Sequence, residues 1–349
     1  MSTSWQPAPG RPVEEADASL APLDGRTVAV IGYGTMGRAH ALNLRDAGVP
    51  VIVGARPGSP RGALAAEEGL TVLPVGDAAA AGDVVALMLP DEAMAAVHAA
   101  DIAPRLRPGA ALAFAHGFAI AFDQIDPGDR PCFLVAPKAQ GDLLREAAAA
   151  GAGVPGLLAV TDTSPPGTWS LCAAYALAIG CLRGGGWPTT FRAECVADQF
   201  GEQAVLCGGV VELLQAAFDT LTDRGHDPVN AYFECVHELH LITDLLRRHG
   251  VDGMRARISP TAAYGGLTRG PRLIDAGVRA RMADLLQEIE DGRFAREFLD
   301  RHDDPDHGTA ALARREADTP LARRGRMLQP RLDACAPPPA DPTPEEPSR

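Results

Sequence analysis

The chain of 349 residues contains almost no lysine. Its 32 basic residues are 31 arginines and one lysine, Lys138. Such a bias indicates that arginine replaces lysine wherever either residue serves, so a position that keeps lysine needs a compact ammonium group rather than a planar guanidinium. Chance survival of a single lysine is the alternative interpretation. On the first interpretation, Lys138 is a candidate functional residue.

The sequence also lacks the segments that would direct it into a membrane or out of the cell. No run reaches the roughly 18–20 uninterrupted apolar residues of a membrane span, and the polar N-terminus has no apolar signal-peptide core. The seven cysteines, an odd number with no CxxC pair, are typical of reduced thiols. These absences predict a cytoplasmic protein that spans no membrane.

Basic clusters are absent as well. The net charge is −13 at pH 7, and no stripe of basic and aromatic residues offers a surface for phosphates. Nucleic acid and anionic membrane are therefore excluded as partners. An acidic balance instead suits a site that holds divalent cations.

Hydrophobic periodicity divides the chain into two folded parts. Between residues 23 and 190, short apolar runs alternate with helical segments, which predicts an α/β domain with a Rossmann-like, doubly wound parallel sheet. From 191 to 335, long amphipathic patterns predict an all-helical domain. Residues 1–22 and the proline-rich residues 336–349 have the composition of disordered tails. The predicted strands are 27–31, 49–53, 84–89, 110–114 and 133–136.

A glycine-rich turn follows the first predicted strand. Residues 32–37 read Gly-Tyr-Gly-Thr-Met-Gly, which fits G-x-G-x-x-G, and they open a helix at the start of the first βαβ unit. In that context the first glycine permits the tight turn, the second lets the backbone approach a pyrophosphate, and the third lets helix and strand pack closely. The helix N-terminus faces the negative charge. The motif therefore predicts dinucleotide binding.

The residues after the second predicted strand bear on the choice between NAD and NADP. An acidic residue there would bind the ribose 2′-hydroxyl and repel a 2′-phosphate, but residues 54–61 read Gly-Ala-Arg-Pro-Gly-Ser-Pro-Arg. The guanidinium groups of Arg56 and Arg61 and the hydroxyl of Ser59 offer donors for a phosphate. The loop thus predicts NADPH as the cofactor, and solvated surface arginines are the alternative.

Four acidic residues in the second half form two pairs at helical spacing. Asp198 and Glu202 are four residues apart, as are Glu234 and Glu238, so each pair shares one face of a helix. Aromatic and aliphatic residues flank both pairs, and carboxylates buried among them would need compensating cations. Hard oxygen ligands on rigid helices suit Mg²⁺, and two such ions could clamp a small oxygen-rich substrate. Four solvated acids on helix surfaces are the alternative.

Together these features resemble ketol-acid reductoisomerase (acetohydroxy-acid isomeroreductase), in the short form of the family with one knotted helical domain. The resemblance covers about residues 24–330 in the family's order, and its helical segments are very specific. The matching stretches are VAVIGYGTMGRAHALNLRDAGV, VVALMLPDEAM, AFAHGF, FLVAPK, DQFGEQAVLCGGVVELLQAAFDTL, AYFECVHELHLITDLL and ISPTAAYGGLTRGPRLID.

The resemblance implies a two-step reaction in branched-chain amino acid (valine and isoleucine) biosynthesis. An alkyl group migrates in a 2-hydroxy-3-keto acid of the 2-acetolactate type under Mg²⁺, and NADPH then reduces the resulting 2-keto acid to a 2,3-dihydroxy acid. It also implies two Mg²⁺ ions and a homo-oligomer that is at least a homodimer, because the active site of the short form is shared between subunits.

The resemblance also assigns the metal ligands. It implies that Asp198 bridges both Mg²⁺ ions and that Glu202, which is also counted among the catalytic residues, binds one of them. Glu234 and Glu238 serve the other ion and are contributed across the subunit interface. All four positions carry the residue that the family pattern requires.

The remaining roles fall on single residues. His116, in AHGF, matches the active-site histidine, Lys138 matches the lysine of the family's Pro-Lys motif, and Ser259 matches the substrate-binding serine. The residues expected to contact the cofactor, from the motif and the resemblance together, are Gly32, Tyr33, Gly34, Thr35, Met36, Gly37, Arg56, Ser59, Arg61, Asp91, Glu92, Ala93, Met94 and Gly141.

Several positions depart from the family's usual pattern. Thr35-Met36 replaces Ser-Gln, residues 138–142 read Lys-Ala-Gln-Gly-Asp in place of Lys-Gly-Pro-Gly-His, and residues 260–264 read Pro-Thr-Ala-Ala-Tyr in place of Asp-Thr-Ala-Glu-Tyr. Two explanations stay open. One is a housekeeping enzyme of a divergent lineage, and the other is a paralogous reductoisomerase of specialised metabolism acting on a related 2-hydroxy-3-keto acid.

Two further hypotheses belong to other classes. A non-catalytic dinucleotide-binding protein would be free to lose its acidic cluster and Lys138, which this chain keeps. A metal-free NADP-dependent reductase would turn over in the presence of EDTA, whereas a reductoisomerase would not.

Overall fold

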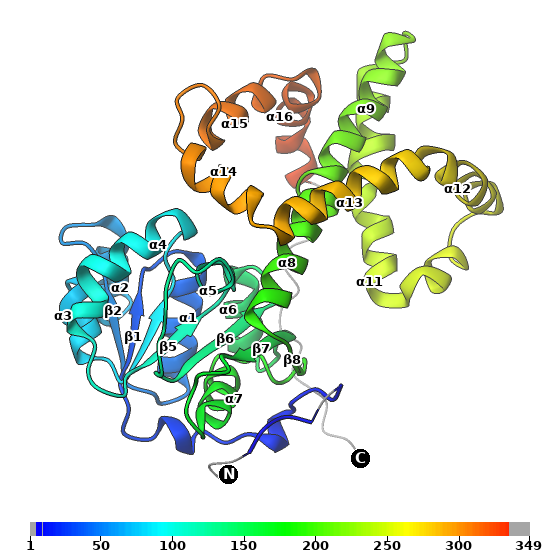
Figure 1. Ribbon diagram of the computed structural model, residues 1–349. Coiled ribbons are helices and arrows are strands. Elements are labelled where there is room, and N and C mark those ends of the chain that lie inside the picture. Colours follow the sequence, from blue (N-terminus) through cyan, green and yellow to red (C-terminus); the bar gives the residue numbers. More distant parts are fainter. Residues whose placement is uncertain (1–4, 9, 335–349) are drawn as a thin grey trace. The chain divides into compact units, whose positions relative to one another are not determined.

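The computed structural model of the protein describes residues 5–8 and 10–334. The chain divides into two compact units between Ala197 and Asp198 (Figure 1). The division falls a few residues after the expected boundary at 190/191, because the first turns of the helix that begins at Phe191 belong to the unit that contains the sheet. The predicted architecture, a Rossmann-like parallel sheet followed by a helical part, is confirmed.

An eight-stranded sheet forms the centre of the first unit, in the order β3-β2-β1-β4-β5-β6-β7-β8. Neighbouring strands pair in parallel except for β6 and β7, which are antiparallel. The strand order reverses between β1 and β4, and ligands of open α/β sheets bind outside the carboxyl ends of the strands at such a point. The strands are β1 (Val28–Ile31), β2 (Val51–Gly54), β3 (Thr71–Leu73), β4 (Val84–Leu87), β5 (Ala111–Phe114), β6 (Cys132–Pro137), β7 (Gly156–Val160) and β8 (Gly186–Pro188).

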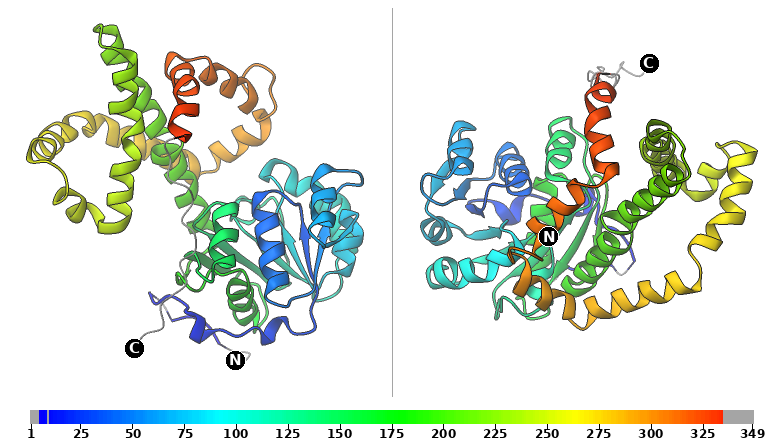
Figure 2. Two further views of the ribbon diagram at one scale, coloured as in Figure 1. Left: turned by 180° about the vertical axis from the view of Figure 1, so that it is seen from behind. Right: turned by 90° about the horizontal axis from the view of Figure 1, so that it is seen from above.

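Helices cover both faces of this sheet (Figures 1 and 2). Val28 and Val30 of β1 point to the face that packs against α1, α6 and α7, whereas Ala29 and Ile31 point to the face covered by α3 and α4. Because both faces are covered, the central strands are apolar at every position. The helices of the first unit are α1 (Thr35–Asp46), α2 (Pro60–Glu67), α3 (Val75–Ala81), α4 (Asp91–Val97), α5 (Phe118–Ala121), α6 (Gly141–Ala149), α7 (Thr168–Ala178) and the first turns of α8 (Phe191–Gly201).

Residues 10–22 differ from the disordered tail expected over residues 1–22. Val13 exchanges two backbone hydrogen bonds with Gly186 of β8, at N–O distances of 2.7 and 2.9 Å, and its side chain is buried. The Glu15 carboxylate accepts a hydrogen bond from Arg183 Nε at 2.8 Å. The prediction of disorder is therefore wrong for this segment, because composition alone does not reveal its pairing with an edge strand. The tail expected over 336–349 lies outside the described residues.

The described part of the second unit is helical, with no strand between residues 198 and 334. Its buried centre is small and includes Phe218 of α9, Tyr232 of α10 and Leu328 of α16. The helices that follow α8 are α9 (Gly209–Asp223), α10 (Pro228–Tyr232), α11 (Leu239–Arg255), α12 (Pro260–Leu273), α13 (Ala276–Glu290), α14 (Arg293–Arg301), α15 (Thr309–Ala317) and α16 (Pro320–Asp333).

Much apolar surface of the second unit is exposed in the single chain. Leu206, Tyr264, Leu267 and Leu273 are each between 63% and 66% exposed. In addition, the helical stretch 191–223 is long and apolar enough to cross a membrane by length and composition alone, although a single helix of this kind is weak evidence for a membrane span. In soluble proteins, large contiguous apolar patches on the surface mark interaction sites.

Candidate active site

The glycine-rich turn connects β1 to α1 at the point where the strand order reverses. Gly32 has a φ of +98°, and a Cβ atom at this position would lie 2.5 Å from the carbonyl oxygen of Met88, the residue after β4. A Cβ atom on Gly37 would lie 2.2 Å from the carbonyl oxygen of Gly32. α1 begins at Thr35 without a side-chain cap, so no side chain competes with a ligand for the N–H groups of its first turn. The turn therefore has the geometry that a dinucleotide requires.

A second helix N-terminus lies against this turn. A Cβ atom on Gly141, the first residue of α6, would lie 2.4 Å from the carbonyl carbon and oxygen of Thr35. Only a glycine permits α6 to begin this close to the start of α1. Because helix N-termini carry partial positive charge, two of them together make a stronger anion cradle than one.

The loop after β2 places its basic residues at the surface. Arg56 and Arg61 are exposed, and neither has a carboxylate partner among the residues that the structure describes. Ser59 caps α2, since its Oγ accepts a hydrogen bond from the Gly62 N–H at 3.1 Å. Two guanidinium groups thus flank a helix N-terminus at the carboxyl end of β2.

The predicted cofactor contacts at residues 91–94 form the first turn of α4, after the carboxyl end of β4. Asp91 and Glu92 stand at the start of the helix. Met94 points into the core between the sheet and its helices and is 5% exposed. Its side chain therefore supports the packing of α4 in this unit.

A charge cluster around one buried carboxylate lies at the carboxyl ends of β5 and β6. His116 follows β5, Lys138 follows β6, and the carboxylate of Glu194, in the first turns of α8, lies between them. One Glu194 oxygen is 3.0 Å from Lys138 Nζ, and the other is 3.2 Å from His116 Nδ1. The Gly117 N–H also donates to Glu194 at 2.9 Å. The side chain of Glu194 is 1% exposed, so these donors together compensate a fully buried charge.

The charges in this cluster shift one another's pKa values. Burial by itself lowers the pKa of His116, but hydrogen bonds with Cys195 and Glu194 outweigh it and raise this pKa to about 11. Burial by itself raises the pKa of Glu194, but the hydrogen bond from His116 and the charge of Lys138 outweigh it and lower this pKa. The Glu194 carboxylate is therefore ionised and held by two cations at neutral pH. Perturbed pKa values of this kind are concentrated in functional sites.

Glu194 was not among the residues expected from the sequence. It lies four residues before Asp198, which in turn lies four residues before Glu202, so the three acids follow one another at helical spacing. Extending the predicted pair by one turn toward the N-terminus would have found it.

The expected metal ligands of the second unit lie at unusual backbone. α8 ends at Gly201, and the following segment, Glu202–Leu206, is π-helical. A second π-helical segment, Phe233–His237, contains Glu234 and directly precedes Glu238. π-helical turns are rare and are found frequently at functional sites. Their coincidence with two of the predicted ligands supports a function for both positions.

The sequence predicts that these acids are buried, but most of them are exposed in the single chain. Glu202, Glu234 and Glu238 are exposed, and Asp198 is half-buried. The prediction of burial is wrong for the single chain, because apolar neighbours such as Leu206 are themselves exposed. The donor set, carboxylate oxygens in pairs on helices, nevertheless fits the ligand preference of Mg²⁺. Ser259 is exposed and caps α12, with its Oγ accepting from the Ala262 N–H at 3.2 Å.

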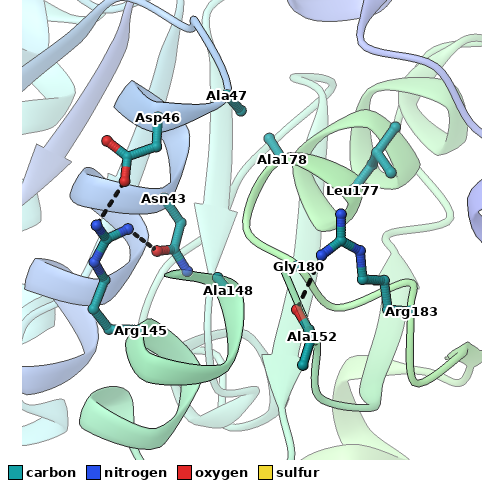
Figure 3. Close-up of a pocket in the computed structure, with 10 residues that line it drawn as sticks. All are labelled: Asn43, Asp46, Ala47, Arg145, Ala148, Ala152, Leu177, Ala178, Gly180 and Arg183. Atoms are coloured by element: carbon teal, nitrogen blue, oxygen red, sulfur yellow. Dashed lines mark hydrogen bonds and ion pairs between the residues drawn. The ribbon is translucent and has the colours of Figure 1, made fainter. Parts of the chain in front are cut away.

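A cavity of about 210 Å³ lies elsewhere in the first unit, among the last turns of α1, α6 and α7 (Figure 3). Its polar side chains are already paired: Arg145 donates to Asn43 at 2.7 Å and forms an ion pair with Asp46 at 2.6 Å, and Arg183 pairs with Glu15. Helix C-termini carry partial negative charge. The cavity therefore does not fit the phosphates of a dinucleotide, and the N-termini of α1 and α6 do.

Comparisons with known families assign both parts of the chain. Residues 22–185 match the family described as acetohydroxy acid isomeroreductase, NADPH-binding domain. Residues 191–333 match the family described as ketol-acid reductoisomerase, C-terminal domain.

A solved structure agrees with this assignment. The chain is 37% identical to an NADH-preferring ketol-acid reductoisomerase from an uncultured archaeon, with a TM-score of 0.86, over 91% of this chain and 98% of that one. A semialdehyde dehydrogenase NAD-binding protein from Cupriavidus necator is 21% identical, with a TM-score of 0.56, over 76% of this chain and 99% of that one. The second likeness concerns the fold alone.

Proposed function

Because the chain belongs to the ketol-acid reductoisomerase family, we propose that it converts a 2-hydroxy-3-keto acid of the 2-acetolactate type to a 2,3-dihydroxy acid, with Mg²⁺ and NADPH, in valine and isoleucine biosynthesis. The observation that carries the proposal is the buried Glu194 carboxylate, which holds Lys138 and His116 at the carboxyl ends of adjacent strands. A protein that only bound a dinucleotide would gain nothing from burying this charge.

In this proposal the chain's own residues position the substrate and manage protons. Glu194 orients the Lys138 ammonium group by accepting a hydrogen bond from Lys138 Nζ at 3.0 Å. The Nδ1–H of His116 donates to the same carboxylate, so the imidazolium ring is held in one orientation. Positively charged donors fixed in this way suit the negatively charged oxygens of a keto acid.

Asp198, Glu202, Glu234 and Glu238 would hold two Mg²⁺ ions, and Ser259 would bind the substrate. Bound Mg²⁺ would supply Lewis acidity toward the substrate's oxygens, and bound NADPH would supply the reducing equivalents. The steric requirement for glycine at positions 32, 37 and 141 is the observation that fits the cofactor to this chain.

We further propose that the cofactor is NADPH rather than NADH. Arg56 and Arg61 are exposed at the N-terminus of α2, and the described part of the chain offers neither of them a carboxylate. The archaeal relative is described as NADH-preferring, so the preference has to be measured for this chain.

We expect Arg56→Ala to weaken NADPH binding about 10-fold, since it removes a charge-assisted hydrogen bond to the 2′-phosphate, and to leave NADH binding unchanged. An Arg56→Ala variant that binds NADPH as tightly as the parent would contradict this assignment.

The proposed active enzyme is an assembly of at least two copies of the chain. The apolar surface of α12 and the exposed glutamates lie in a unit whose own buried centre is small. A second copy of the chain would cover that surface and bring carboxylates from two subunits to one substrate. A cytoplasmic location without nucleic acid or membrane partners stays a prediction from the sequence.

A second candidate is a paralogous reductoisomerase of specialised metabolism. The observation that favours it is the changed sequence near the expected substrate site, with Ala263 in place of the family's usual glutamate and Asp142 in place of its histidine. Such an enzyme would act on a related 2-hydroxy-3-keto acid with a different substituent.

The test is NADPH oxidation by the purified protein with 2-acetolactate and Mg²⁺, beside 3-hydroxy-3-methyl-2-ketobutyrate, the substrate of the second step alone. We expect turnover of both and none of either in EDTA. Turnover in EDTA would identify a metal-free reductase. Turnover of neither substrate by protein that binds NADPH and Mg²⁺ would favour the paralogue.

A further inference from the structure

The Glu68 carboxylate, at the end of α2, forms a polar contact with two residues of the glycine-rich segment. It accepts a hydrogen bond from Tyr33 Oη at 2.7 Å and lies 2.9 Å from Arg38 Nε and 2.5 Å from Arg38 Nη2. The side chains of Glu68 and Arg38 are 21% and 33% exposed, and Tyr33 is buried. The hydrogen bond from Arg38 lowers the pKa of Glu68, so the carboxylate is ionised at neutral pH.

These two partners flank the turn that receives the dinucleotide. Tyr33 is the second residue of the Gly32–Gly37 motif, and Arg38 is the residue that follows it. One carboxylate therefore fixes the turn at both of its ends. Without it, the buried Tyr33 hydroxyl would lose its acceptor, which is costly for a buried polar group.

The arrangement matters for binding because the turn recognises phosphate through backbone N–H groups. Those groups bind tightly only if the backbone already has the bound conformation, since ordering a loose turn subtracts from affinity. Neither Gly32 nor Gly37 has a side chain that could hold the turn in place. Beside the backbone hydrogen bond from the Gly32 N–H to the Gly54 carbonyl, the contacts of Tyr33 and Arg38 with Glu68 anchor the turn through side chains.

We propose that Glu68 is a positioning residue that sets the affinity of the glycine-rich turn for the cofactor without touching the cofactor. The inference rests on cofactor binding by the first unit and not on the identity of the substrate. A merely structural ion pair at this depth would affect stability slightly and leave cofactor affinity unchanged.

The test compares Glu68→Gln with Glu67→Gln, an exposed carboxylate one residue earlier on the same helix. Binding of NADPH to the full-length protein is followed by nucleotide fluorescence, without substrate or Mg²⁺. We expect Glu68→Gln to raise the Kd about 10-fold, because hydrogen bonds to charged groups are strong, while Glu67→Gln leaves it unchanged. In turnover assays, Glu68→Gln should raise the KM for NADPH and leave kcat at saturating cofactor unchanged.

Tyr33→Phe provides a second, milder variant because it removes only the hydroxyl. We expect it to raise the Kd as well, and the double variant Tyr33→Phe/Glu68→Gln to show less than the product of the two single effects, because both remove the same contact. An unchanged or tighter Kd in Glu68→Gln, or independent effects in the double variant, would overturn the proposal. Because no catalysis is measured in the binding assay, these outcomes are separate from a failure of the proposed reaction.

Discussion

At the scale of single residues, Glu194 is the group on which the first-unit charge cluster depends. Glu194→Gln keeps the shape and the acceptor for the Gly117 N–H but removes the charge that holds Lys138 and His116. Because hydrogen bonds to charged groups contribute about 1.5–3 kcal/mol, we expect kcat to fall about 10- to 100-fold. The Kd for NADPH should not change.

Steady-state kinetics with 2-acetolactate and equilibrium binding of NADPH measure the two effects of Glu194→Gln separately. Glu212→Gln, an exposed acid on α9, is the control. Parent-like kcat in Glu194→Gln would show that the cluster serves only the packing of α8 against the sheet.

The sequence revealed the site residues that belong to a recognisable motif or are unusual in the composition. The glycine-rich turn has a motif, and Lys138 is the only lysine. Glu194 carries only its four-residue spacing to Asp198, and an acid at that spacing in an acidic protein is not distinctive until the fold places it between two cations. The exposure of Glu234 could not be predicted either, since spacing defines a helix face but not what covers that face.

A second residue-scale prediction concerns His40, which is fully buried on α1. Its Nδ1 lies 2.9 Å from Tyr175 Oη, and burial lowers its pKa to about 3. The unfolded chain binds a proton below the ordinary histidine pKa of about 6.5, whereas the folded protein stays neutral until about pH 3. Stability is therefore lost as the pH falls through this window, by about 1.4 kcal/mol for each pH unit.

Urea unfolding at pH 7 and pH 5, followed by tryptophan fluorescence, measures this loss. All three tryptophans, at positions 5, 169 and 187, belong to the first unit and report its unfolding. We expect His40→Phe to reduce the difference between the two pH values and His226→Gln, at an exposed histidine, to preserve it. An equal pH dependence in parent and His40→Phe would show that His40 is not the titrating group.

At the scale of elements, the first unit depends on the close approach of α6 to α1. Gly141→Ala would place a Cβ atom 2.4 Å from the Thr35 carbonyl group, so α6 would have to move away from the glycine-rich turn. We expect the Kd for NADPH to rise at least about 10-fold, with a loss of stability of about 1–3 kcal/mol. Gly270→Ala, in open space within α12, is the control and should be neutral or slightly stabilising. Parent-like NADPH affinity in Gly141→Ala would exclude α6 from the cofactor site.

Five strands with a continuous apolar run were predicted from the sequence, whereas β7, which also has such a run, and the short edge strands β3 and β8 were not. The predicted runs match β1, β2, β4, β5 and β6, which are covered on both faces and therefore apolar throughout. β3 and β8 are three residues long, and β8 ends in a proline, so neither has a pattern that a sequence can show. The π-helical segments were also beyond prediction, because they depend on local backbone geometry rather than on residue type.

At the scale of the whole molecule, the apolar surface of the second unit requires an explanation beyond one chain. Leu267 and Leu273, both on α12, are 63% and 65% exposed. If a second copy covers them, replacing both with aspartate buries two uncompensated charges in the interface and prevents association. We expect Leu267→Asp/Leu273→Asp to sediment as a monomer and to lose Mg²⁺-dependent turnover. NADPH binding should persist, since the nucleotide cradle lies within the first unit.

Leu143→Asp, at an exposed leucine of the first unit, is the control and should leave the oligomeric state unchanged. A parent chain that sediments as a monomer while turning over 2-acetolactate would instead show that one chain supplies all the carboxylates.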